Sequence, residues 1–504
     1  MQLARELGHA PLEPHALGLE RERVGVTVGQ RALEPRQQGR FPGRVRRGEQ
    51  LVDLLEECGE SISCHRASPI IRGLPARGKG RSAYPQKRSG PYLTAMRMLL
   101  TMLPVGRRRL PIAVLAALVL AAPAGAGESQ LAKRLARALA VPHVSPARTA
   151  ALVFDLQSGT TIFSEHDTLS LAPASNEKLA VTYAALVALG PEFRIETNVV
   201  GRGEQQGATW RGSLLLVGHG DPTLSRSGLF SLARQVRAAG ITRVTGAVFG
   251  DESFFDARRT APGWKSWFYV NESPPLSALT VDRALYRGRI SRNPALSSAL
   301  AFRDALRRVG VSVAGAGLGV DRGDGVPLAS VESPPLAAIL RYMDHASDNF
   351  TAELLLKQLG TLVATPGTTA AGAAYVARTL SQAGIPLAGV RLADGSGLSL
   401  LDRATARELS ALLRAAWTDP DVRPVFVAAL PVAGVNGTLS DRMRRPPARG
   451  HVFAKTGTTS IASALSGFVR RRYVFSVLQN GNPVSPFWAR RAQDRFATVL
   501  AASR

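Results

Sequence analysis

Beyond residue 126 the pattern of helix-like and strand-like segments changes once and later returns. This change is the strongest constraint on how the 504-residue chain can fold. From about Phe193 to Arg292 short strand-like segments, broken by Gly and Pro, replace an earlier helix-rich pattern. The helix-rich pattern then returns. A pattern that is interrupted and resumed predicts one domain inserted into another. Residues 127–192 and 293–504 would form the host domain, and residues 193–292 would form an inserted domain of mixed strands and helix.

The predicted host domain is of the α+β class. Residues 150–166 read as two strands joined by a Gln-Ser-Gly turn. Three late strands are close enough in sequence to form an antiparallel meander, and the helix that ends the chain has an apolar face that could cover their sheet. Further helices are predicted on both sides of the insert. The late strands are expected at 451–457, 463–469 and 473–480, and the helices at 129–140, 171–190, 294–310, about 335–356, and 486–503.

A secretory signal is predicted at residues 98–126. Three arginines, Arg107 to Arg109, precede the apolar run Leu110 to Ala122, and small residues for cleavage follow at Ala124 to Ala126. The run is too short to span a bilayer comfortably, so a permanent anchor is the weaker alternative. We therefore expect export across the inner membrane, to the periplasm or cell wall.

Residues 1–97 are hard to reconcile with a signal that should stand at the N-terminus. They are rich in Arg, Gly and Pro and lack a sustained helical or strand period. The interpretation is a doubtful extension, disordered or produced by a mis-set start, with translation beginning at Met96, Met98 or Met102. A cytosolic regulatory tail is the alternative.

Charge and cysteine content narrow the classes of function. The net charge of +25 suggests nucleic acid as a partner. However, the basic residues beyond residue 126 are scattered and form no stripe interleaved with aromatic side chains, so no nucleic-acid partner is expected. Peripheral contact with an anionic membrane or cell-wall polymer remains open. Both cysteines, Cys58 and Cys64, precede the signal, which excludes thiol chemistry and disulfides from the rest of the chain.

Ser175 and Lys178 form a Ser-x-x-Lys motif at the start of an apolar helical segment. Residues three apart on a helix share a face, so the two side chains can touch. A serine hydroxyl becomes a good nucleophile when a neighbouring base takes its proton, and a lysine serves as that base when its pKa is lowered. Lys178 is the one lysine of the chain with Ser three positions before it. The alternative is a capping Ser beside a solvated Lys.

Two further short motifs follow in the chain. Ser347-Asp348-Asn349 fits Ser-x-Asn, as does Ser291 with Asn293, which we discount because Pro294 follows at a predicted domain edge. Lys455-Thr456-Gly457 lies in a predicted strand, where Gly lets a ligand backbone approach closely; an ordinary strand end is the alternative. The order Ser-x-x-Lys, Ser-Asp-Asn, Lys-Thr-Gly is the set typical of class A β-lactamases and penicillin-binding proteins.

With these motifs in order, the chain resembles the low-molecular-weight class C penicillin-binding proteins, the DacB-like D-alanyl-D-alanine carboxypeptidases/endopeptidases. The resemblance runs from about Val144 to the C-terminus. It implies a serine β-lactamase/DD-peptidase-like core, namely an antiparallel sheet flanked by helices plus a helical subdomain. The segments that carry it are PASNEKL, GHGDPTL, ASDNFTAELLLKQLG, DGSGLS, LPVAGVNGTL and AKTGTTSIASALSGF.

The resemblance also implies a mechanism on peptidoglycan stem peptides, with β-lactam antibiotics as inhibitors. The nucleophile would be Ser175 and its base a neutral Lys178, while Ser347 would relay a proton to the leaving amine. Asn349 would hold the substrate amide, and Lys455 would supply positive potential. The terminal carboxylate would bind at Thr456 and Thr458, and the peptide N–H groups of Ser175 and Thr458 would form the oxyanion hole beside Gly457. No metal or cofactor is expected.

Two departures from the family pattern and two alternative functions remain. The insert is shorter than in family members with two inserts, and His219 stands where a small residue is usual. A β-lactamase on the same core would need a Glu-activated water, and Glu353, one turn past Asn349, is expected on a packed helix. A non-catalytic wall-binding protein is the other alternative, against which the intact motifs argue.

Overall fold

The computed structural model describes residues 124–503. The extension 1–97, both cysteines and most of the predicted signal segment lie outside these residues. The helix expected at 129–140 is present and begins earlier, as α1 (Ala124–Leu139).

The host domain contains a five-stranded antiparallel sheet with strand order β12-β13-β14-β1-β2. The predicted hairpin and the predicted late meander are both confirmed. β12 lies at one edge of the sheet. The strands are β1 (Thr149–Asp155), β2 (Thr160–Glu165), β12 (Val452–Thr458), β13 (Ala462–Val469) and β14 (Tyr473–Asn480).

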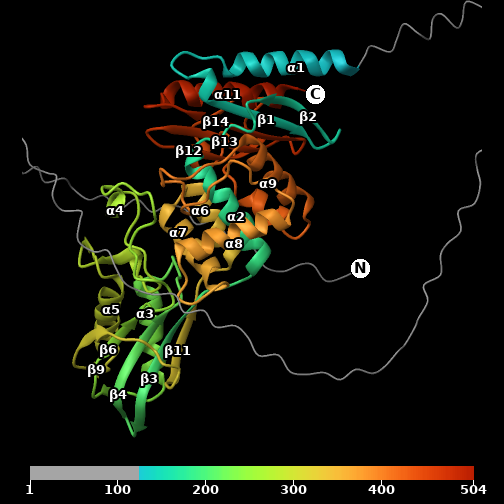
Figure 1. Cartoon of the computed structure of the whole chain (residues 1–504). Helices are drawn as coiled ribbons and strands as arrows, with labels where there is room; N and C mark the ends of the chain where they lie inside the picture. The colour runs from blue at the N-terminus through green and yellow to red at the C-terminus, as the bar shows by residue number, and fades with distance from the viewer. Residues whose placement is uncertain (1–123, 504) are drawn as a thin grey trace, which may run out of the picture. The chain divides into compact units, whose positions relative to one another are not determined.

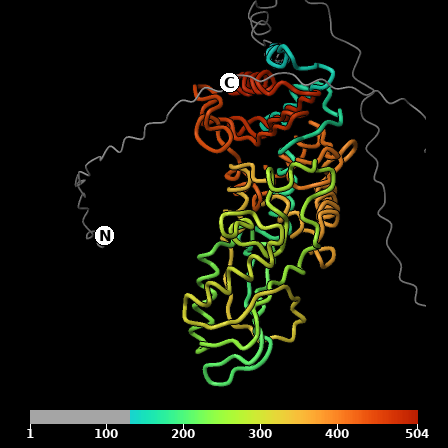
Figure 2. Tube along the Cα trace, turned by 90° about the vertical axis from the view of Figure 1, so that its left-hand side faces the viewer, coloured from blue at the N-terminus to red at the C-terminus, as the bar shows by residue number. Residues whose placement is uncertain are grey.

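Helices cover both faces of this sheet (Figure 1). On one face, α1 and α11 (Pro486–Ala502) bury Phe496 and Leu500 against Phe475, as the apolar face of the terminal helix predicted. On the other face lie α2 (Lys178–Leu189) and α9 (Ala406–Thr418). Figure 2 shows the first and last parts of the described chain side by side, because β1 pairs with β14.

A helical subdomain adjoins the sheet and shares an apolar core with α2 and α9. Its helices are α6 (Leu336–Ala346), α7 (Asn349–Thr361), α8 (Thr369–Gln382) and α10 (Arg423–Ala429). The single helix predicted over about 335–356 is wrong. The chain breaks at Ser347, which adopts a left-handed conformation with φ 56°, and Asp348 then caps α7 by accepting the Thr351 N–H at 2.8 Å.

The inserted domain has the mixed architecture that was predicted. Its main sheet has the order β10-β6-β4-β3-β11, antiparallel across β4-β3-β11 and parallel across β10-β6-β4. Helices α3 and α5 pack on this sheet. The elements are β3 (Glu196–Gln206), β4 (Thr209–Gly218), α3 (Arg226–Ala238), β5 (Arg243–Val244), β6 (Val248–Asp251), α4 (Phe268–Asn271), β7 (Leu285–Tyr286), β8 (Arg289–Ile290), α5 (Pro294–Arg308), β9 (Ser312–Val313), β10 (Ala316–Leu318) and β11 (Val326–Glu332).

The predicted end of the insert at residue 292 is wrong. The apolar face of α5, with Ala295, Ala299 and Phe302, packs into the core of the insert beside Leu214 and Leu216. The strands β9, β10 and β11 also complete its sheet, so the insert ends after β11. The returning helical pattern suggested the host domain, but periodicity does not say which sheet a helix covers.

His219 follows β4 directly. Its Nδ1 lies 3.0 Å from the Glu196 carbonyl oxygen and its ring packs edge-on against Phe254 at 5.0 Å. The histidine therefore closes the end of the β3–β4 pair.

Candidate active site

Ser175 lies on a short 3-10 turn, Ala174–Glu177, that leads directly into α2. Pro173 precedes the turn, and Ala174 has a positive φ of 48°, so the chain enters the helix sharply. This geometry leaves Ser175 half-buried while the rest of the helix start is buried. The predicted Ser-x-x-Lys contact forms: Lys178 Nζ donates to Ser175 Oγ at 3.1 Å.

Lys178 is fully buried and makes three hydrogen bonds from its amine. Besides Ser175 it donates to Asn349 Oδ1 at 2.9 Å and to the Ser396 carbonyl oxygen at 2.6 Å. Burial lowers the pKa of Lys178, although Asp394 and Asp344 nearby act in the opposite direction. A lysine in this setting loses its proton more readily than one in water.

Ser347 and Lys455 form the second half of the site. The break between α6 and α7 turns Ser347 toward β12, where Lys455 Nζ donates to its Oγ at 2.8 Å. Asn349, the first residue of α7, belongs to the first pair, because its Oδ1 accepts from Lys178 Nζ. The five predicted catalytic residues therefore form two hydrogen-bonded groups, Ser175 with Lys178 and Asn349, and Ser347 with Lys455, which the main chain of the Ser347-Asp348-Asn349 motif joins.

The two buried lysines influence each other's charge. The pKa of Lys455 falls to about 7 because of burial and because of the charge on Lys178, while the carboxyl group of Asp344 opposes the fall. The pKa of Lys178 is lowered as well. Two ammonium groups in one dry site repel, so each lysine holds its proton less tightly while the other is charged.

Thr456, Gly457 and Thr458 end β12 beside the nucleophile. A Cβ on Gly457 would lie 2.9 Å from the Pro173 carbonyl oxygen and 3.1 Å from the Ser175 nitrogen, so only glycine allows this approach. Thr456 Oγ1 donates to Thr438 Oγ1 at 2.8 Å. Thr458 Oγ1 accepts from Arg490 Nη2 at 3.3 Å.

The outer edge of β12 is open at its C-terminal end. Val452 and Ala454 direct their peptide groups away from β13, to Ala433 and Pro431. In an antiparallel ladder every second residue faces the same edge, so the peptide groups of Thr456 and Thr458 also point outward. The Thr458 N–H thus lies on the edge next to Ser175, where an oxyanion donor is needed.

Sequence reasoning assigned no role to the loop Asp394–Ser399, although it quoted its sequence. Asp394 accepts the N–H groups of Ser396, Gly397 and Ser399 at 2.7–3.1 Å, and this turn presents the Ser396 carbonyl to Lys178. A main-chain carbonyl leaves no mark in a sequence, which is why this contact could not be predicted.

Glu353 supports the same loop from α7. It is fully buried, and its Oε1 accepts from the N–H groups of Gly395 and Ser396 at 3.0 and 2.9 Å. Burial and the charge of Asp394 raise the pKa of Glu353 to about 8. A carboxyl group held in this way serves the loop, which agrees with the expectation that it lies on a packed helix.

The loop of the inserted domain that carries Trp264 and Glu272 reaches the site, another contact without a sequence signal. Trp264 Nε1 donates to Asp394 at 2.8 Å, and the Glu272 carbonyl accepts from Asn349 Nδ2 at 3.0 Å. The insert therefore touches both the loop that orients Lys178 and the asparagine that contacts it.

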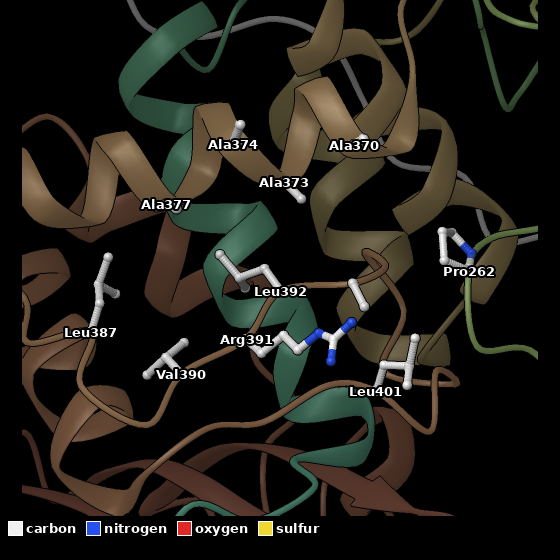
Figure 3. Close-up of a pocket in the computed structure, with 11 residues that line it drawn as sticks. Pro262, Ala370, Ala373, Ala374, Ala377, Leu387, Val390, Arg391, Leu392 and Leu401 are labelled. Carbon is white, nitrogen blue, oxygen red and sulfur yellow. The ribbon is translucent and has the colours of Figure 1, made fainter. Parts of the chain in front are cut away.

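An apolar pocket of about 390 Å³ lies on the far side of this loop, between α8 and residues 387–401 (Figure 3). Alanines of α8, Leu387, Leu392 and Leu401 line it together with Pro262 of the insert. Arg391 is the single charged residue in its lining, and none of the predicted catalytic side chains reaches it.

Within residues 124–503 we find no cluster of His, Cys, Asp and Glu arranged to hold a metal ion. Over the same residues, no helix combines the length and apolar character needed to cross a bilayer.

Fold and site together define a serine hydrolase of the acyl-transfer type, with a lysine in place of the usual histidine base. The comparisons with known proteins agree. The profile of the D-Ala-D-Ala carboxypeptidase 3 (S13) family matches residues 131–295 and 285–503. The chain belongs to this family.

Individual relatives support the assignment. A D-alanyl-D-alanine carboxypeptidase of Actinomadura sp. (strain R39) is 32% identical over 468 residues, which cover 74% of this chain and 85% of the relative. Carboxypeptidase DacB of Mycolicibacterium smegmatis is 33% identical, covering 73% and 83%. The crystal structure of penicillin binding protein 4 (dacB) from Haemophilus influenzae has the same fold, with a TM-score of 0.63 at 22% identity over 74% of this chain and 98% of that one. The chain is accordingly a serine-type D-Ala-D-Ala peptidase.

Proposed function

We propose that Ser175 is the acylated nucleophile of a D-Ala-D-Ala carboxypeptidase/endopeptidase that acts on peptidoglycan stem peptides and is inhibited by β-lactams. The observation that carries the proposal is the buried Lys178, whose amine lies 3.1 Å from Ser175 Oγ and 2.9 Å from Asn349 Oδ1. Burial lowers the pKa of Lys178, and its neutral form can accept the serine proton.

The proton path follows the hydrogen bonds of the site. Ser175 Oγ attacks the carbonyl carbon of the penultimate D-Ala while Lys178 takes its proton. The oxyanion binds the N–H groups of Ser175 and Thr458, where one donor is typically worth about 3 kcal/mol of barrier. The leaving amine takes a proton through the Ser347 hydroxyl, which Lys455 orients at 2.8 Å. Water then hydrolyses the acyl-enzyme, and the serine proton is restored.

Labelling with a fluorescent penicillin and incubation with defined muropeptides test this proposal. Wild-type protein should keep the label with slow turnover and release D-Ala from a monomeric pentapeptide, while Ser175→Ala should do neither. Label on another serine would overturn the assignment of the nucleophile. Rapid loss of the label would indicate a β-lactamase, and no labelling at all would indicate a non-catalytic wall-binding protein.

We also propose that the protein acts outside the inner membrane, after removal of residues 98–126. The basic residues and apolar run of that segment support export, and peptidoglycan lies in that compartment. N-terminal sequencing of the native protein is the test. A mature N-terminus near Gly127 is expected, whereas one upstream of Met96 would contradict the proposal.

A further inference from the structure

A groove of about 740 Å³ runs along the outer face of α11, beyond the end of β12. It lies between α11 and the loop that contains Arg442 and Met443. Four arginines line it, against one acidic residue, Asp494. The exposed Phe487 closes one side.

The positive charge of this groove is largely uncompensated. Arg442 pairs with Asp494 at 2.7 Å, which neutralises the one carboxylate of the lining. Arg490, Arg491 and Arg495 are exposed, and no ion pair to any of them is found among residues 124–503. Arg491 and Arg495 stand four residues apart, so they follow one another along the same face of the helix.

Arg490 connects the groove to the reaction cleft. Its Nη2 donates to Thr458 Oγ1 at 3.3 Å, and Thr458 ends the open edge of β12. The hydroxyls of Thr456 and Thr458 are where the carboxylate of the leaving group is expected. The groove therefore begins where the leaving group departs.

We propose that this groove binds the leaving strand of a crosslinked stem peptide through its carboxylates. The inference rests on the proposed function. It concerns the crosslinked stem peptide, which is the substrate of the endopeptidase reaction and the larger of the two substrates. A single D-Ala offers one carboxylate, which the two threonines and Arg490 suffice to hold. Arg491, the next residue of α11, and Arg495, about one turn further on, are left for a longer leaving group with additional carboxylates.

The chemistry is the same for both substrates. The C–N bond between the D-Ala carbonyl and the amine of the second peptide breaks, the acyl group passes to Ser175 and the amine takes a proton. The groove adds affinity for the departing peptide and no new reaction step.

Two double variants test the subsite with matched changes of charge. Arg491→Gln/Arg495→Gln removes two groove charges, whereas Arg234→Gln/Arg378→Gln removes two exposed charges elsewhere, on α3 and α8. The value of kcat/KM is measured on a monomeric pentapeptide and on a crosslinked muropeptide dimer. We expect the ratio of dimer to monomer cleavage to fall about tenfold in the groove variant, as for the loss of two partly exposed ion pairs, and to stay constant in the control.

The dependence on ionic strength and the binding to lipid vesicles are two further measurements. The wild-type ratio should decrease as ionic strength rises, and this dependence should weaken in the groove variant, which a purely structural effect would not produce. An equal loss on both substrates would overturn the subsite while leaving the proposed function intact. If wild-type protein cleaves neither substrate, the proposed function itself fails. If the groove variant no longer sediments with phosphatidylglycerol vesicles while its ratio of dimer to monomer cleavage is unchanged, the groove binds membrane. That outcome would overturn the proposal.

Discussion

At the scale of single residues, the site depends on two lysines that burial makes unlike ordinary surface lysines. Lys178 and Lys455 are both fully buried, yet each amine has hydrogen-bond acceptors. If the amines were buried without acceptors, the free energy of desolvation would be too costly. If they had acceptors but were exposed to water, both amines would stay protonated. The combination gives one lysine that can act as a base and a second that can supply charge.

Lys178→Arg tests the assignment of the base. Arginine keeps the charge but does not deprotonate in proteins. We expect acylation by penicillin to fall about 10²- to 10⁴-fold. In the wild type the acylation rate should rise with pH through the lowered pKa of Lys178, since only its neutral form accepts a proton. Near wild-type acylation by the arginine variant would show that another group is the base.

Lys455→Ala tests the coupling of the two lysines. A nearby cation disfavours the protonated form of Lys178, so its removal should raise the pKa of Lys178 and move the acylation profile to higher pH. The difference should be clearest below about pH 7, where Lys455 itself is charged. Lys455→Arg keeps the charge in a broader side chain and should retain measurable activity. An unchanged rate and profile in the alanine variant would make Lys-Thr-Gly an ordinary strand end.

At the scale of elements, the break between α6 and α7 positions the second motif. Asp348 caps α7 and also binds Arg283 of the insert with two bonds, at 3.0 and 2.8 Å. Burial raises the pKa of Asp348, but the bonds to Arg283 outweigh it, so the net shift is downward. The carboxylate therefore fixes the helix start between Ser347 and Asn349.

Asp348→Ala should destabilise the protein by about 1–3 kcal/mol, because it removes a helix cap and leaves Arg283 without its partner. Unfolding in urea, followed at neutral pH, measures the change. Because the folded pKa of Asp348 is lowered, its contribution is present above the unfolded value near 4 and is lost as pH falls through the folded pKa. Asp348→Asn, which can still cap, should lose less; equal stability of all three proteins would exclude this role.

At the scale of the whole molecule, the insert takes part in the site as well as extending the fold. Its loop supplies Trp264 to Asp394 and the Glu272 carbonyl to Asn349. An apolar cluster of Phe255 and Leu276 with Phe350 of α7 holds the loop in place. The two domains therefore share the positioning of Lys178 and Asn349.

Trp264→Phe should slow acylation about tenfold, because it keeps an aromatic side chain but removes the indole N–H that donates to Asp394, a charged hydrogen bond worth about 1.5–3 kcal/mol. Trp267→Phe is the matched control, since Trp267 is 53% exposed three residues away. Fluorescent-penicillin kinetics measure both. Slowing in the control alone, or in neither variant, would argue against the contribution of the insert.

The sequence alone determined the local features of this protein. The segments with a period of two residues predicted the hairpin and the meander, and the apolar face of the terminal helix predicted that this helix covers the sheet. These signals depend on residues that are close in sequence. The three motifs and their order also pointed to the residues that the structure brings together around Ser175 and Lys178.

Only the tertiary structure decided which groups surround those motifs. The break at Ser347, the place of α5 in the insert, the Ser396 carbonyl and the contact of Trp264 with Asp394 all join segments far apart in the chain. Periodicity shows that a helix has an apolar face but does not identify the sheet against which it packs. A main-chain carbonyl is the same in every residue, so its role follows from where the fold places it.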